Sequence, residues 1–235
     1  AGWATTFSDM TIVSENRVTR IPKEISYDVA SLLGCAVTTG LGIVFNNLVL
    51  KPGQSIAVWG VGGVGLNVLQ GAALVNAYPI VAIDVNDEKL KRAMQFGATH
   101  TVNVKNVDAH AFLMELSNGN GFDATVDTTG NTQVIETAFN ATARSTGRTV
   151  LAGVPQHDKR ITIDSFTLHF GRRIFGSHGG ETNPDVDIPR YIGLYQRGKL
   201  KLDELITHRY PLKEINQAID TVRKGEAGKC VVSMS

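Results

Sequence analysis

Three glycines at a fixed spacing give this chain its clearest chemical signal. The stretch SIAVWGVGGVGLNVLQGAAL places Gly60, Gly62 and Gly65 in the pattern GxGxxG, between an apolar run and a helical pattern. In that context the first glycine permits a tight turn, the second lets the backbone approach a pyrophosphate, and the third lets the helix pack close to the strand. Free N–H groups and the dipole at the helix start would hold the phosphates. A glycine-rich turn needed only for packing is the weaker interpretation. The candidate residues of this turn are Gly60, Val61, Gly62, Gly63, Val64 and Gly65.

A carboxylate follows the glycines at the distance expected in a dinucleotide-binding motif. The next apolar run, PIVAID, ends in Asp84, about 20 residues after the glycines. A carboxylate there can accept hydrogen bonds from both ribose hydroxyls of an adenosine and would repel a 2′-phosphate. No arginine follows directly, and Lys89 is the nearest cation, which would either reach the ribose or lie on a helix surface. The pattern favours NAD over NADP as the cofactor; an aspartate that only caps its strand is the alternative.

The stretch GCAVTTGLG contains Cys35, one of only two cysteines. Cys230 lies far away in the sequence, and no CxxC or HExxH spacing occurs. The pair therefore fits neither a disulfide framework nor a local zinc site, and reduced thiols in a cytoplasmic protein are the simplest interpretation. The six histidines show no ligand spacing either. Within these residues alone, Cys35 is expected to be a small buried thiol.

The length, charge and composition of the chain limit the kinds of molecule that it is expected to bind. The chain has 235 residues and a formal net charge of +1, so it is long enough for one large or two small domains and carries no overall field that would attract nucleic acid or an anionic membrane. No apolar run reaches the length expected of a membrane span. The first residues, AGWATTFSDM, have neither the basic nor the apolar region of a signal peptide and no initiator Met. We therefore expect a fragment or a processed product.

The middle of the chain alternates short β-rich runs with helical patterns, which predicts βαβ units and a doubly wound parallel sheet with helices on both faces. The expected strands are Ser55–Trp59, Ile80–Asp84, His100–Val104, Ala124–Asp127 and Arg148–Ala152. The expected helices lie at about 63–77, 87–96, 108–118 and 131–143.

The two chain ends have a different pattern and are expected to form a second unit around the inserted sheet. Residues 10–21 are expected to form short strands with a turn at Glu15–Asn16. After the connection GGETNPD, residues 179–185, further elements are expected: a helix near 187–197, a strand near 202–206, a helix near 214–224 and a strand at Lys229–Ser233.

The order of these motifs resembles the zinc-dependent alcohol dehydrogenases of the medium-chain dehydrogenase/reductase superfamily. The resemblance covers nearly the whole chain and includes LLGCAVTTGLG, KPGQSIAVWGVGGVG, DVNDEKL, GVP at 153–155 and EINQAIDTVRKGEAGKCVV. It implies a Rossmann dinucleotide-binding domain at 36–178. Residues 1–35 would be the end of a GroES-like catalytic domain, and residues 179–235 would return to that domain. Most of the family's N-terminal lobe has no match here.

The resemblance also assigns roles to single residues. Cys35 matches the third protein ligand of the catalytic zinc, whereas the other two ligands, the proton relay and the structural-zinc cysteines belong to the unmatched lobe. Three protein ligands plus water is the usual catalytic arrangement, and one cysteine cannot make it. Thr39 and Val64 match residues beside the nicotinamide. The remaining matches are Thr129 near the adenosine, Gly153 and Val154 at the carboxamide, and Lys229 at the pyrophosphate. The resemblance further implies a homodimer, or a dimer-based oligomer, joined by edge strands around 161–178.

The implied activity is hydride transfer between an alcohol and NAD, giving an aldehyde or ketone, with zinc as a Lewis acid in the complete protein. The chain by itself is expected only to bind NAD(H). One alternative is a zinc-free, NADPH-dependent quinone or enoyl reductase of the same superfamily, against which Cys35 and Asp84 argue. The other is a nucleotide-binding module without catalysis. The pattern does not indicate which alcohol or carbonyl compound is the substrate.

Overall fold

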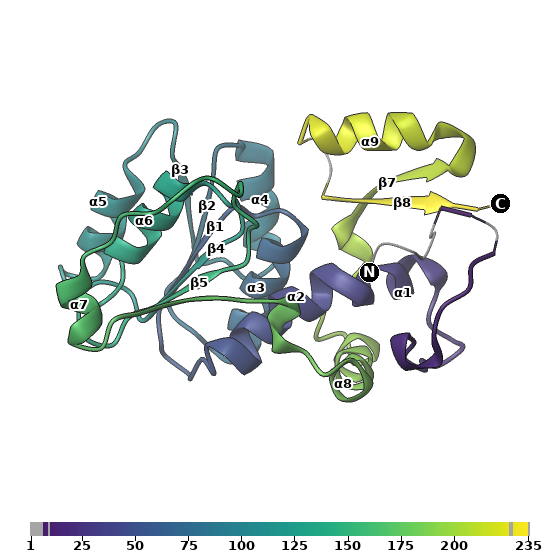
Figure 1. Ribbon diagram of the computed structural model, residues 1–235, viewed down its shortest axis with the longest axis horizontal. Helices are drawn as coiled ribbons and strands as arrows, with labels where there is room; N and C mark the ends of the chain where they lie inside the picture. Colours follow the sequence, from purple (N-terminus) through teal and green to yellow (C-terminus); the bar gives the residue numbers. More distant parts are fainter. Residues whose placement is uncertain (1–6, 9, 226–227, 235) are drawn as a thin grey trace. The chain divides into compact units, whose positions relative to one another are not determined.

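The computed structural model describes residues 7–8, 10–225 and 228–234. The chain divides into two compact units (Figure 1). Unit 1 comprises the described residues up to Gly34 and from Asn183 onward, so it is built from both ends of the chain. Unit 2 is the continuous segment Cys35–Thr182.

Unit 2 is organised around a six-stranded sheet in the order β3-β2-β1-β4-β5-β6, and every neighbouring pair is parallel. This is the doubly wound order of the Rossmann class, and it confirms the predicted fold class. The five predicted strands form within a residue of their expected ends. The strands are β1 (Ile56–Trp59), β2 (Ile80–Asp84), β3 (His100–Asn103), β4 (Ala124–Asp127), β5 (Arg148–Leu151) and β6 (Arg173–Gly176).

Helices cover both faces of this sheet. Figure 1 shows α3 and α4 on one face and α5 and α6 on the other. A buried cluster on the second face joins Trp59 and Ile83 of the sheet to Leu113 of α5 and Ala138 of α6. The helices, all predicted, are α3 (Gly63–Leu74), α4 (Asp87–Gln95), α5 (Ala109–Leu116) and α6 (Thr132–Asn140).

Local capping explains where three of these helices begin. Asn86 accepts from the N–H groups of Glu88 and Lys89 at the start of α4. Asp108 and Asn131 cap α5 and α6 in the same way. Such side chains satisfy backbone donors that a helix start leaves unpaired, so helix ends are readable in the sequence.

A helical segment that the sequence patterns did not predict runs from Tyr27 to Asn47. It consists of α1 (Tyr27–Leu32), η2 (Leu33–Val37), α2 (Thr38–Gly42) and η3 (Ile43–Asn47), where η2 and η3 are π-helical turns. By length and composition this helix is apolar enough to cross a membrane, contrary to our expectation from the sequence. Two-thirds of its apolar window (67%) is buried inside the protein, as in the core helix of a folded domain.

Where the chain enters and leaves unit 2, its segments are clasped together. The hydroxyl of Thr182 donates to the carbonyl oxygen of Thr38 at 3.0 Å, and the amide of Asn46 donates to the carbonyl of Gly180 at 3.1 Å. Gly180 belongs to a 3₁₀ turn, η4 (Gly179–Glu181). Packing of η4 against α2 therefore closes unit 2 on itself.

The expectation of edge strands around 161–178 is wrong for residues 161–170, because the β-rich stretch ITIDSFTLHF forms no strand. Its second half is the short helix α7 (Ser165–His169), which begins where Asp164 accepts from the N–H of Phe166 at 2.9 Å. Only β6, further along, joins the sheet, and it forms one edge of it.

Unit 1 contains a two-stranded parallel sheet of β7 and β8 together with two longer helices. The strand predicted near 202–206 is wrong: a 3₁₀ turn, η5 (Asp203–Leu205), stands there and the strand starts at Ile206. The short strands predicted at 10–21 are also wrong, since the described residues there form only the 3₁₀ turn η1 (Glu15–Arg17). The other elements are α8 (Pro184–Gln196), β7 (Ile206–Pro211), η6 (Leu212–Glu214), α9 (Ile215–Arg223) and β8 (Lys229–Ser233).

Candidate functional site

The glycine turn lies where β1 passes into α3, beside the point at which the strand order reverses. β1 pairs with β2 on one side and with β4 on the other. The chain leaves β1 toward one edge of the sheet and leaves β4 toward the opposite edge. In open parallel sheets, ligands bind in the crevice that this reversal creates at the carboxyl ends of the strands.

Two glycines are required by the geometry of this turn. Gly60 has a φ of +83°, and a Cβ placed on it would lie 2.5 Å from the hydroxyl oxygen of Thr128. A Cβ on Gly65 would lie 2.1 Å from the carbonyl oxygen of Gly60. A side chain at position 60 would therefore collide with the loop after β4, and one at position 65 would push helix α3 away from the end of β1. Gly62, the N-cap of α3, faces open space within 4 Å, as a phosphate cradle needs.

Asp84 ends β2 and is tied directly to the glycine turn. One of its carboxylate oxygens accepts from the N–H of Val61 at 2.9 Å. The other accepts from the N–H groups of Val85 and Asn86, at 2.8 and 3.1 Å. Three backbone donors thus fix the carboxylate beside the crevice, and one acceptor position on the first oxygen is left over. The sequence-predicted pair of glycine turn and carboxylate is brought together.

Two residues that sequence reasoning left without a role, Asp127 and Thr128, support the same turn from β4. The hydroxyl of Thr128 lies 2.7 Å from the carbonyl oxygen of Gly60, to which it donates. The carboxylate of Asp127 accepts from Thr129 and Gly130. The signal that would have found them is an apolar strand that ends in Asp, as β2 also does, followed here by a turn that contains a glycine.

Thr129 and Val154 line a pocket of about 540 Å³ next to this loop. Val154 is largely exposed, and Gly153 lies directly against the 128–130 loop. Most of the other lining side chains are polar and can donate or accept hydrogen bonds, whereas Lys159 is the cation of the group. The remaining lining residues are Gly130, Asn131, Thr132, Gln133, Gln156 and Lys159.

Thr39 and Val64 are placed by the packing of α2 on α3. A Cβ on Gly40 would lie 2.7 Å from the carbonyl oxygen of Val64, so the two helices touch through their backbones next to both residues. Thr39 is buried and Val64 is half-buried. Lys89 is half-buried in the first turn of α4. Lys229 belongs to unit 1, where it begins β8 opposite Ile206.

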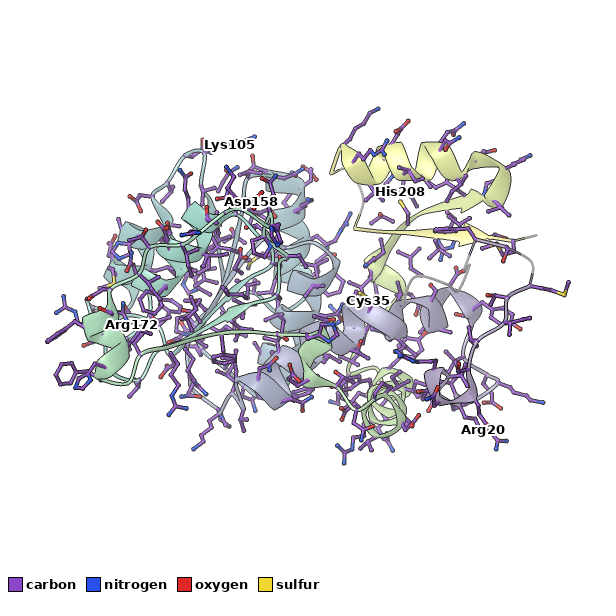
Figure 2. All side chains as sticks on the ribbon, viewed as in Figure 1. Arg20, Cys35, Lys105, Asp158, Arg172 and His208 are labelled. Carbon is purple, nitrogen blue, oxygen red and sulfur yellow. The ribbon has the colours of Figure 1, made fainter. Side chains whose placement is uncertain are left out.

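Cys35 is exposed on the helical segment in η2, contrary to the expectation of a buried thiol (Figure 2). Among the described residues, no group of three or more His, Cys, Asp or Glu side chains could hold a metal ion. A catalytic zinc needs such a set of protein ligands, so the described residues by themselves do not fit that metal.

Comparison with known proteins agrees with this geometry. Over 97% of the chain, it is 39% identical to S-(hydroxymethyl)glutathione dehydrogenase of Saccharomyces cerevisiae and 35% identical to alcohol dehydrogenase 2 of Zea mays. The solved structure of benzyl alcohol dehydrogenase from Acinetobacter calcoaceticus superposes on 92% of the chain with a TM-score of 0.88 and 32% identity. An alcohol dehydrogenase zinc-binding domain protein from Burkholderia ambifaria superposes on 96% of it with a TM-score of 0.90 and 30% identity.

The fold and the crevice together define a doubly wound α/β protein of the Rossmann class. The profile of the family described as zinc-binding dehydrogenase matches residues 63–196, and the chain belongs to that family. The chain spans about 60% of the length of the curated relatives it matches: 60% of the yeast protein and 61% of the maize protein. It covers 59% of the Acinetobacter structure and 60% of the Burkholderia one.

Proposed function

We propose that unit 2 binds NAD(H), and that the protein of which this chain is part is an oxidoreductase of the alcohol dehydrogenase type. The observation that carries the proposal is the hydrogen bond from Val61 N–H to the Asp84 carboxylate. It joins the phosphate-binding turn to the carboxylate that would hold the adenosine ribose. The two proposed recognition elements of a dinucleotide thus form a single hydrogen-bonded unit.

The cofactor, when bound, would supply the hydride chemistry, and the chain's residues would bind and orient it. The open face at Gly62 and the first N–H groups of α3 would receive the pyrophosphate. The ribose hydroxyls would donate to Asp84, and Thr129 would border the adenosine. Thr39 and Val64 would back the nicotinamide ring, and backbone groups of residues 153–154 would meet its carboxamide. Lys89 and Lys229 are the proposed cationic contacts to the ribose and the pyrophosphate.

The proposed substrates are alcohols and the corresponding aldehydes or ketones. Relatives named for alcohol, benzyl alcohol and S-(hydroxymethyl)glutathione dehydrogenation support this class. Zinc in the complete protein is proposed from the family, with Cys35 as one of its ligands. A carboxylate at the proposed ribose position argues against the alternative of an NADPH-dependent quinone or enoyl reductase, because Asp84 would repel the 2′-phosphate of NADPH.

The cofactor proposal is tested by titrating the chain with NADH and NADPH and following the cofactor's fluorescence. We expect tighter binding of NADH. Replacing Asp84 with Ser should narrow the difference, because the repulsion of the 2′-phosphate disappears. Asp87→Ser, in the next helix, is the matched control, and it should leave the preference unchanged. Tighter binding of NADPH by the unmodified chain would refute the proposal.

A second candidate function is nucleotide binding without catalysis by this chain alone. It is favoured because the described residues offer Cys35 no group of three or more potential metal ligands. We predict that the purified chain holds no stoichiometric zinc at Cys35 and oxidises no alcohol at a useful rate. NADH binding should persist, because the glycine turn and Asp84 do not depend on a metal. Elemental analysis that finds one zinc per chain, lost in Cys35→Ala, would contradict the prediction.

We further propose a homodimer joined through β6, in a cytoplasmic protein. β6 pairs only with β5 in the sheet, so its other edge has backbone groups that a second copy's strand would satisfy. Free Cys35 and Cys230 are consistent with a reducing compartment. Light scattering at micromolar concentration should give the mass of two chains; a monomer there would count against the interface.

A further inference from the structure

Asp127 has a fully buried carboxylate that the proposed function does not use. It is 0% exposed and is the register partner of Trp59, the residue directly before the glycine turn. Among the described residues, no lysine, arginine or histidine forms an ion pair with it. Burial of a carboxylate is costly unless hydrogen bonds compensate, so its donors indicate what it holds in place.

The donors to the Asp127 carboxylate all come from the 128–130 loop, which borders the pocket. One carboxylate oxygen accepts from the N–H of Thr129 at 3.0 Å and from its hydroxyl at 2.6 Å. The other oxygen accepts from the N–H of Gly130 at 2.9 Å. The carbonyl oxygen of Asp127 accepts from the N–H groups of Ala152 and Gly153, at 2.8 and 3.0 Å. The side chain of Asp127 therefore holds the 128–130 loop, and its backbone carbonyl holds the start of the loop at 152–155.

The two loops also touch each other and the glycine turn. A Cβ on Gly153 would lie 2.2 Å from the backbone nitrogen of Gly130, so their backbones are in direct contact. Between them and the turn, the Thr128 hydroxyl donates to the carbonyl of Gly60. A shift in the 128–130 loop would consequently displace both the 152–155 loop and the glycine turn.

We infer that Asp127 is a positioning residue for the dinucleotide: without touching it, Asp127 holds Thr129, Gly153 and the glycine turn in the one arrangement that the cofactor needs. The inference rests on the proposed binding of NAD(H). Asparagine has nearly the shape of aspartate but only one acceptor oxygen, and its NH₂ group faces a backbone N–H wherever it is placed. At least one loop donor then loses its acceptor.

The test compares Asp127→Asn with Asp123→Asn in the full 235-residue chain. Asp123 precedes the same strand at its amino end, where its carboxylate accepts from the N–H and the hydroxyl of Ser55 at 2.9 and 2.8 Å. Both variants remove an acceptor and should lower the melting temperature. Only Asp127→Asn should bind NADH more weakly, by about tenfold, which corresponds to about 1.4 kcal/mol. Equal affinities for the unmodified chain and Asp127→Asn would overturn the inference, as would equal losses in both variants.

A measurement on the unmodified chain keeps the test valid if Asp127→Asn does not fold. The N–H groups of Thr129 and Gly130 donate to the Asp127 carboxylate, so their amide hydrogen exchange should be slow without cofactor. Addition of NADH should change it little, because the loop is already held in its binding arrangement. Strong new protection of these two amides by NADH would show that the cofactor itself orders the loop and would overturn the inference. Failure of the unmodified chain to bind NADH would refute the proposed function itself, which distinguishes the two cases.

Discussion

Replacing Gly40 with alanine tests how closely α2 packs on α3. A Cβ at this position would lie 2.4 Å from the Cβ of Asn67, 2.7 Å from the carbonyl oxygen of Val64 and 2.9 Å from the backbone nitrogen of Val68. Two of these three atoms belong to the backbone of α3 and cannot rotate away. The helices would have to separate by about 1 Å to restore ordinary contact distances of about 3.5 Å.

The magnitude follows from two opposing effects. Overpacking of a tight contact costs about 1–3 kcal/mol, and alanine in a helix gains back about 1 kcal/mol over glycine. We expect the higher part of the range because backbone atoms oppose the new group, which leaves a net destabilisation of about 1–2 kcal/mol. For a chain of this size the melting temperature should fall by roughly 2–8 °C.

Two further glycines provide matched controls in thermal unfolding. A Cβ on Gly71 would meet only side-chain atoms of Leu41 and Val44, at 3.1 to 3.4 Å, so Gly71→Ala should be milder. A Cβ on Gly34 would meet nothing within 4 Å, so Gly34→Ala should raise stability by up to about 1 kcal/mol. NADH affinity should fall with Gly40→Ala, since Val64 moves with α3. A Gly40→Ala protein as stable as the unmodified chain would refute the packing argument.

Two other predictions concern buried and paired polar groups. Arg148 donates to the carbonyl of Leu48 and, at 3.1 Å, to the side-chain oxygen of Gln54, so Arg148→Met should lower the free energy of unfolding in urea by about 1–3 kcal/mol; an unchanged midpoint would count against it. The hydrogen bond from Tyr195 to Asp203, at 2.6 Å, raises the pKa of the phenol from 10.0 to about 12. The unfolded chain releases this proton first, so the stabilisation is present below about pH 10 and is lost as the pH rises to about 12. The difference between the ultraviolet titration curves of the unmodified chain and of Tyr195→Phe should show a phenol that ionises late. In Asp203→Asn the pKa of Tyr195 should return to its ordinary range.

The parallel sheet was predictable because each βαβ unit is specified by local patterns. The apolar runs that end at Asp84 and Asp127 are buried strands, and caps such as Asn86 mark the helices that follow. The contact between the glycine turn and Asp84 was predictable as well, since parallel strands bring their carboxyl ends to one edge of the sheet. Thr128 was missed because its partners, Trp59 and Gly60, are set by the sheet register. Asp127 was missed although the donors to its carboxylate are its own sequence neighbours, because only the glycine turn and Asp84 were considered as a binding signal.

The wrong predictions share a physical cause: β-rich composition does not make a strand without a partner. Met10 and Ile12 are 89% and 95% exposed, so this segment has neither a neighbouring strand nor a face to bury. In the segment after Ile161, the cap supplied by Asp164 outweighs β-propensity and starts a short helix. The helical segment containing Gly40 was missed for the opposite reason, because close packing stabilises a glycine-rich sequence of low helix propensity.

The clasp between Thr182 and Thr38 has a consequence for the order in which the chain folds during synthesis. All of unit 2 has been made once residue 182 has left the ribosome, whereas β7 still awaits β8, its partner near the end of this chain. Domains generally fold as units, from the amino-terminal side during translation. Closure of unit 2 would hold the segments that lead to Gly34 and Asn183 close together, where an unfolded chain would have a long loop between them. This removes most of the entropic cost of joining the two halves of unit 1. Unit 2 would thereby act as an internal template: it would fold first in the nascent chain, and unit 1 would assemble on a connection that is already made.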